Sequence, residues 1–123
     1  MKLRIARHTT NLEKIVAFYR DVLGLEELGG FKDHQNYDGV FLGFKGESWH
    51  LEFTVSDEVP DHKPDEDDLL VLYADTEEDQ DSLIHNIKEA GINPVPAKNP
   101  YWEENGVTIL DLDGYRVVIS INK

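Results

Sequence analysis

Two histidines and one glutamate in the N-terminal half are the side chains with the clearest chemical potential. His50 and Glu52 are two residues apart in the segment Trp49-His50-Leu51-Glu52-Phe53-Thr54, and His8 ends the first apolar stretch of the chain. Two imidazoles and one carboxylate are the ligand set of many non-haem iron centres. A carboxylate among apolar neighbours is also suited to proton abstraction, because burial raises its pKa. Glu52 is therefore the candidate catalytic residue.

Each of these side chains also has a simpler interpretation. Same-face neighbours on one strand diverge, so His50 and Glu52 do not readily chelate one ion. An ion pair with Arg4 or Arg116 would keep Glu52 ionised and structural. We therefore predict a metal-free site in which Arg4, His8, His50 and Arg116 bind a ligand. A rebuilt metal site of Glu52, His8 and His50 is the alternative.

Aromatic residues supply a second group of candidate ligand contacts. Tyr101 and Trp102 are adjacent in a predicted loop that precedes a strand, where large aromatic side chains are costly to leave in water. They form either a structural lid or a stacking wall for a planar or apolar ligand. His34 and Tyr37 occupy the corresponding loop of the first half, and we include them as ligand-binding candidates. A solvated turn is the other interpretation of that pair.

Charge and composition exclude several classes of function. The chain has 123 residues and a formal net charge of −13, which disfavours nucleic acid and anionic membranes as partners. There is no cysteine, which removes thiol catalysis and thiolate metal sites. No segment approaches the roughly 18 apolar residues of a membrane span, and the N-terminus lacks the core of a signal peptide. We expect a cytoplasmic protein without a membrane or nucleic-acid partner.

The negative charge is concentrated where the chain is divided. Residues 57–81 contain 12 of the 25 acidic residues and a single base, Lys63. Within this stretch, residues 57–68 have one apolar residue besides two prolines, which is typical of an exposed and self-repelling linker. The linker separates a first part of about residues 1–56 from a second part of about residues 69–123.

These two parts resemble each other. Gly24 closes a predicted helix in the first part and Gly91 closes one in the second, 67 positions apart. Gly39-Val40 and Gly106-Val107 have the same offset, and the alternating strand 50–55 matches 116–121. Each part has the pattern strand, helix and three strands. The predicted strands are 3–8, 26–31, 39–44, 49–55, 69–74, Val95, 106–112 and 115–121, and the predicted helices begin after Asn11 and span about 78–90.

Strand alternation divides the polar from the apolar side chains. In the strand 49–55 the odd-numbered residues are apolar and predicted to pack under the helix, which leaves His50, Glu52 and Thr54 on the other face. Arg4, His8 and Arg116 have the corresponding parity in their strands. The sequence therefore predicts an α+β fold of two βαβββ modules in tandem, whose mixed sheets curl round a central cup lined by the more polar faces.

The duplicated pattern resembles the vicinal oxygen chelate superfamily, which includes glyoxalase I, bleomycin- and fosfomycin-resistance proteins and extradiol dioxygenases. The resemblance is carried by Phe18-Tyr19-Arg20-Asp21-Val22-Leu23-Gly24-Leu25 and by Asp111-Leu112-Asp113-Gly114-Tyr115, and it covers the whole chain as one domain. It implies a divalent metal ion held by first-strand and last-strand residues of each module. Those positions are Arg4, Glu52, Leu69 and Val118, of which only Glu52 can be a ligand.

The function expected from this resemblance is binding of a small organic molecule in the cup, without a cofactor and without the usual metal. The alternative is a metal-dependent lyase, isomerase or dioxygenase in which Glu52 is a ligand or general base. A third interpretation is an interaction module that acts through the acidic linker. The resemblance also implies a homodimer.

Overall fold

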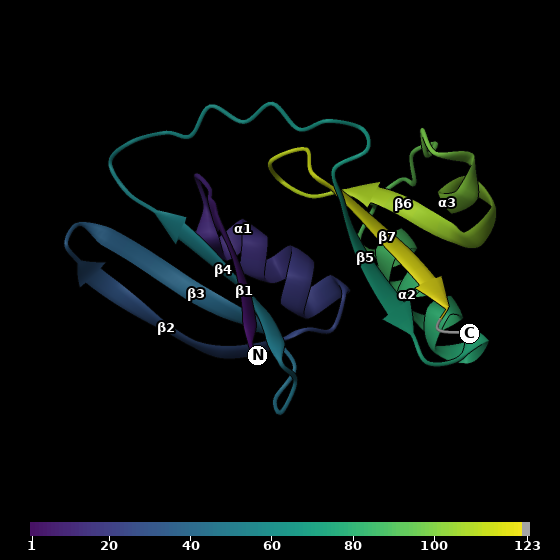
Figure 1. Ribbon diagram of the computed structural model, residues 1–123, viewed down its shortest axis with the longest axis horizontal. Helices are drawn as coiled ribbons and strands as arrows, with labels where there is room; N and C mark the ends of the chain where they lie inside the picture. The colour runs from purple at the N-terminus through teal and green to yellow at the C-terminus, as the bar shows by residue number, and fades with distance from the viewer. Residues whose placement is uncertain (122–123) are drawn as a thin grey trace. The chain divides into compact units, whose positions relative to one another are not determined.

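The computed structural model of the chain describes residues 1–121. The chain forms two compact units, one of residues 1–61 and one that begins at His62. Each unit contains a mixed β-sheet with a helix packed against it (Figure 1). The predicted α+β fold of two tandem modules is therefore confirmed.

The N-terminal unit is built on a four-stranded sheet in the order β1-β4-β3-β2. β1 runs parallel to β4, whereas β3 is antiparallel to both β4 and β2. This arrangement places the first and last strands of the module side by side. The elements are β1 (Leu3–His8), α1 (Leu12–Val16), the π-helix η1 (Ala17–Val22), β2 (Glu26–His34), β3 (Tyr37–Gly43) and β4 (Trp49–Val55).

The C-terminal unit repeats this pairing with one strand fewer. Its sheet has the order β5-β7-β6, with β5 parallel and β6 antiparallel to β7. The strand predicted at Val95 is reduced to an isolated bridge with Thr108. The elements are β5 (Leu69–Ala74), α2 (Glu77–Glu89), α3 (Pro100–Asn105), β6 (Gly106–Leu110) and β7 (Arg116–Ile121).

The helices begin and end where the sequence signals them. The side chain of Asn11 accepts a hydrogen bond from the backbone N–H of Lys14 over 3.0 Å, which caps α1 as predicted. Gly24 and Gly91 have φ values of 84° and 76°. This left-handed conformation is easy for glycine and lets the chain leave each helix, so the repeat is visible in the backbone itself. Among residues 1–121, no helix is long and apolar enough to span a membrane.

The core of the N-terminal unit lies between the helix and the sheet. The rings of Tyr19 and Phe53 stack with centroids 5.0 Å apart, and both side chains are fully buried. Leu51 is buried in the same layer. The odd-numbered residues of β4 therefore face the helix, as strand alternation predicts. This leaves the even-numbered residues on the opposite face of the sheet, which we call the open face.

Other details of the secondary structure also differ from the prediction. Tyr101 and Trp102 lie in a short helix rather than a loop, because Asn99 caps it over 3.0 Å and Pro100 takes its first position. The strands β2 and β3 are longer than predicted and joined by a two-residue turn. The turn residues Gln35 and Asn36 have φ values of 51° and 71°, typical of a type I′ hairpin.

Candidate functional site

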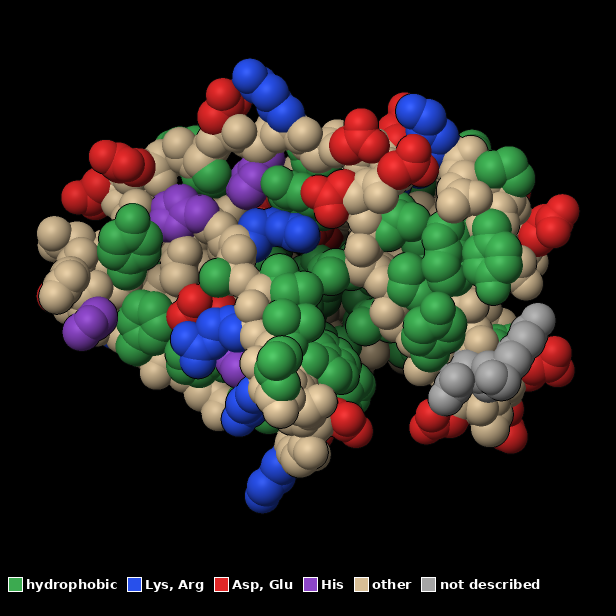
Figure 2. Space-filling model, in the orientation of Figure 1, with side chains coloured by type: hydrophobic (Ala, Val, Ile, Leu, Met, Phe, Trp, Pro, Cys, Tyr) green, Lys and Arg blue, Asp and Glu red, His purple; other side chains and the backbone are tan. Residues whose placement is uncertain are grey.

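The open face of the N-terminal sheet collects the side chains with the clearest chemistry. β1 and β4 lie side by side in parallel, with Arg4 opposite His50, Ala6 opposite Glu52 and His8 opposite Thr54. Opposite residues project to the same side of a sheet. In Figure 2, histidine, basic and hydrophobic side chains lie close together over the strands of this unit. The structure therefore confirms that His8, His50 and Glu52 lie on the same face of the sheet, as strand alternation predicts.

Arg4 links two of the predicted site residues. Its Nε donates a hydrogen bond to Nε2 of His50 over 2.9 Å, and its NH1 nitrogen lies 3.7 Å from Oε2 of Glu52. An arginine N–H only donates, so His50 accepts at Nε2 and carries its own hydrogen on Nδ1. Glu52 is thus in an ion pair with Arg4, one of its two predicted structural partners. Half of the Arg4 side chain is exposed, which leaves the guanidinium accessible from solvent.

His8 is held by a separate set of hydrogen bonds. Its Nδ1 lies 2.7 Å from Oγ1 of Thr54, and its Nε2 lies 3.0 Å from Oγ of Ser56 and 3.1 Å from the carbonyl oxygen of Glu58. Because a carbonyl oxygen only accepts, Nε2 of His8 carries the hydrogen. His8 therefore binds the start of the acidic linker and orders it, as expected for a structural histidine.

Aromatic rings cover the part of the open face next to this cluster. The guanidinium carbon of Arg4 lies 4.7 Å from the ring centroid of Phe41, and the His50 ring meets that ring edge-on at 5.9 Å. Phe31 lies 5.9 Å from Phe41 on the neighbouring strand. A cation over an aromatic face is attracted by the ring quadrupole. Phe41 therefore packs against both Arg4 and His50 on the open face.

Sequence reasoning missed Phe41, although a signal for it was present. In the segment Gly39-Val40-Phe41-Leu42-Gly43, the buried residues are Val40 and Leu42. Alternation along this strand therefore places Phe41 on the open face, by the same argument that placed Glu52 there.

The candidates in the β2–β3 turn lie at the end of the same face. Tyr37 meets the His8 ring edge-on with centroids 5.5 Å apart, and it is 45% exposed. His34 pairs with Tyr37 across the hairpin and lies 6.2 Å from Phe31. Tyr37 is thus part of the cluster around His8, while His34 is at its exposed edge.

In the C-terminal unit, Tyr73 packs beside the predicted aromatic pair of Tyr101 and Trp102. Tyr101 and Trp102 meet edge-on with centroids 4.9 Å apart, and Tyr73 of β5 lies 6.4 Å from Trp102. Tyr73 and Tyr101 are more than half exposed. Hydrophobic side chains gather around α3 and β6 in Figure 2. The three rings give this unit an aromatic surface that remains open to solvent.

Arg116 forms a hydrogen bond and an ion pair within the C-terminal unit. Its NH1 donates a hydrogen bond to the carbonyl oxygen of Pro96 over 2.8 Å, and its NH2 lies 3.9 Å from Oε2 of Glu66. Only 14% of its side chain is exposed. Arg116 therefore fixes the segment that precedes α3, and its predicted role in ligand binding has to operate from this anchored position.

The residues present do not fit the divalent metal ion that the superfamily resemblance implies. Of the four implied positions, Leu69 and Val118 carry no ligand atom, and Arg4 places a positive charge beside Glu52. One carboxylate next to a guanidinium is a poor site for a divalent cation. Within residues 1–121, no three His, Cys, Asp or Glu side chains are grouped so that they could hold a metal ion.

Comparisons with known proteins identify the family. Residues 3–54 match a model described as the YycE-like N-terminal domain, and residues 67–121 match the YycE-like C-terminal domain. The YycE protein of Bacillus subtilis (strain 168) is 38% identical over 123 residues, covering 99% of this chain and 88% of the relative. The chain belongs to the YycE-like family.

Solved structures show that this YycE-like chain shares the fold of proteins of the vicinal oxygen chelate superfamily. The crystal structure of YycE from Bacillus subtilis, a protein of unknown function, matches with a TM-score of 0.88 over 99% of this chain and 90% of the other. Glyoxalase I of Leishmania major matches at 0.77 with 19% identity, over 98% and 86%. The fosfomycin resistance protein FosX of Listeria monocytogenes matches at 0.71 with 16% identity, over 98% and 89%. The last two likenesses show a shared fold.

Proposed function

We propose that the open face of the N-terminal sheet binds a small organic molecule that carries an anionic group, with Arg4 as the anchor and without a bound metal ion. The observation that carries this proposal is the position of Arg4. Its guanidinium is hydrogen-bonded to His50 and paired with Glu52, and it stands where the superfamily resemblance implies a metal ligand. A fixed guanidinium with free N–H groups is suited to carboxylate or phosphate-like oxygens.

The surroundings of Arg4 support an apolar body for the same ligand. Phe41 lies beneath the guanidinium, and Phe31 and Tyr37 continue the aromatic surface toward the hairpin. Ligand sites in proteins commonly combine such apolar walls with a few fixed polar groups. Because His50 and Glu52 hold Arg4 from two sides, the ligand would not have to order a flexible side chain on binding.

A screen by thermal shift tests the proposal. Aromatic and aliphatic carboxylates and phosphonates are compared with neutral amides and amines of the same skeleton, against the wild type, Arg4→Gln and Lys45→Gln. Lys45 is exposed in the same unit and lies in the turn between β3 and β4, and none of its described contacts is with Arg4, His50 or Glu52. We expect anionic compounds to raise the melting temperature of the wild type and Lys45→Gln but not that of Arg4→Gln. Equal shifts in all three proteins would reject Arg4 as the anchor.

Elemental analysis tests the metal-free part separately. Protein purified without chelators should contain no stoichiometric Ni, Zn, Fe or Mn, and a stoichiometric metal would overturn this part of the proposal. Catalysis by Glu52 is a further prediction of the sequence. It requires that a bound compound be converted by the wild type and left unchanged by Glu52→Gln.

A further inference from the structure

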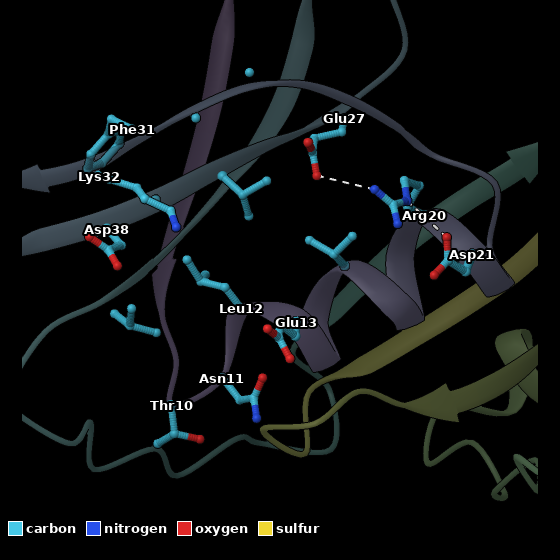
Figure 3. A pocket seen from close by; sticks show the side chains of 16 residues that line it. Thr10, Asn11, Leu12, Glu13, Arg20, Asp21, Glu27, Phe31, Lys32 and Asp38 are labelled. Carbon is cyan, nitrogen blue, oxygen red and sulfur yellow. Dashed lines mark hydrogen bonds and ion pairs between the residues drawn. The ribbon is translucent and has the colours of Figure 1, made fainter.

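A groove lies on the other face of the N-terminal sheet, between the helical segment and β2. It has a volume of about 870 Å³ and is lined by residues of α1, η1, β2 and β3 (Figure 3). This volume is within the range of small-molecule sites. In the middle of the groove, Val40 has the opposite parity to Phe41 along β3, and Gly30 pairs with Val40, so both lie on the face opposite to Arg4 and Glu52. Phe31 lines the outer edge of the groove.

The groove exists because the helix-facing side of β2 is short of side chains. Gly30 pairs with Val40 on this side and fills no space above the sheet. Leu12 and Val16 of α1 approach from the helix, so the middle of the groove is apolar. Leu12, Val16 and Val40 all line the groove.

The charged side chains at one end of the groove are paired with one another. Arg20 of η1 donates from Nε to Asp21 over 2.9 Å and from NH1 to Glu27 over 3.4 Å. The carboxylate of Asp21, together with that of Glu27, raises the pKa of Arg20. Arg20 therefore ties the helical segment to β2 across this end. π-helical turns such as η1 are rare and frequently lie at functional sites.

Further along the groove, one acidic and one basic side chain have no ion-pair partner among the described residues. Glu13 reaches into it from α1, and Lys32 reaches into it from β2 (Figure 3). Neither side chain has a hydrogen-bond or ion-pair partner in the part of the chain that the structure describes. An apolar middle with a free carboxylate on one wall and a free ammonium on the other complements a molecule that carries both charges.

We propose that this groove binds a small zwitterionic ligand with an apolar body, such as an amino acid or short peptide, whose amine faces Glu13 and whose carboxylate faces Lys32. A ligand with only a carboxylate is repelled by the like charges of Glu13 and Asp38, and a ligand with only an amine is repelled by the like charge of Lys32. The zwitterion alone pairs both free groups. Because these side chains are exposed, each pair should change the affinity by roughly two- to five-fold.

Dipeptide probes test both charges at once. Leucyl-leucine, its N-acetyl derivative and its C-terminal amide are titrated into ¹⁵N-labelled full-length protein, and the amide signals of Gly29, Gly30 and Gly39 are followed. We expect the free dipeptide to bind more tightly than either blocked form. Glu13→Gln should remove the preference over the N-acetyl form, and Lys32→Gln should remove the preference over the amide.

Matched controls keep the test specific. Glu78 occupies the first turn of α2 as Glu13 occupies that of α1, so Glu78→Gln removes the same charge from an equivalent helix position. We expect it to leave all three affinities unchanged. Equal affinities for the three probes, or no shift of the glycine signals with any of them, would overturn the proposal. Arg4→Gln should retain dipeptide binding, which separates this groove from the site on the open face.

Discussion

Arg4 and His50 share a hydrogen bond of 2.9 Å in which Nε of the arginine donates to Nε2 of the histidine. His8, by contrast, has Nε2 within 3.1 Å of a carbonyl oxygen, which requires a hydrogen on that nitrogen. The two histidines of the open face therefore carry their hydrogens on different ring nitrogens.

This difference gives a direct spectroscopic prediction. Long-range ¹H–¹⁵N spectra of neutral imidazoles should show His50 with the hydrogen on Nδ1 and His8 with the hydrogen on Nε2. Arg4→Gln should shift His50 toward the Nε2–H form, because the obligatory donor is gone, and should leave His8 unchanged. If His50 kept the Nδ1–H form in the variant, Arg4 would not be what fixes it.

The stacked pair in the core predicts a large loss of stability. Phe53→Ala should lower the free energy of unfolding by about 3–5 kcal/mol, since Phe53 is fully buried against Tyr19. Phe44 is 38% exposed, so Phe44→Ala serves as the comparison and should cost much less. Urea unfolding followed by circular dichroism measures both. Similar losses for the two variants would contradict the assignment of the core.

Two glycines of the hairpin should respond differently to alanine. A Cβ at Gly30 would lie 2.6 Å from the carbonyl oxygen of Gly39, whereas a Cβ at Gly39 would meet the far end of the Phe31 ring. A ring can rotate away but a paired backbone oxygen cannot. Gly30→Ala should therefore cost about 1–3 kcal/mol and Gly39→Ala less. Thermal unfolding of the two variants decides the order, and the reverse order would refute the argument.

The cap of α2 predicts a smaller effect. The side chain of Thr76 accepts a hydrogen bond from the backbone N–H of Asp79 over 3.1 Å. Thr76→Ala should lower the free energy of unfolding by about 1 kcal/mol, and Thr76→Ser should restore most of it because serine is an equally good cap. Chemical denaturation measures the three proteins side by side. A serine variant as unstable as the alanine variant would show that the hydroxyl is not what matters.

Much of the fold could be predicted because its local signals are strong. The strands 49–55 and 69–74 agree with the structure at both ends, since each is an apolar run with clear boundaries. The helix cap at Asn11 and the helix-ending glycines Gly24 and Gly91 are also evident from the sequence. The π-helix η1 is not predictable in this way, because residues 12–23 have the apolar spacing of an ordinary helix.

Composition alone does not locate every loop and strand of this chain. Composition predicts a loop at Tyr101 and Trp102, but Asn99-Pro100 is a helix-start signal, and the structure has a short helix there. The second strand of the C-terminal module is reduced to a bridge at Val95, which no local pattern indicates. Strand pairing depends on contacts far apart in the sequence, so a weak strand next to a helix is decided by tertiary structure.

The candidate site on the open face could be predicted in part from the sequence, whereas the groove could not. Alternation was sufficient to place His50 and Glu52 on one face, and the pairing of β1 with β4 then brought Arg4 to them. The groove on the other face could not be found from the sequence. The absence of a side chain at Gly30 can be read from the sequence, but how far the helix reaches over the sheet depends on tertiary packing.

The outer strand of the N-terminal sheet has one more consequence. β2 ends the strand order, all of its side chains except Phe31 are exposed, and its pairing is irregular between Glu27 and Gly29. A long, flat, regular edge would be a template for self-association, and bulges and charged residues are the usual protection against it. The same irregular, charged strand that borders the groove thus also works against fibril-like stacking of these chains.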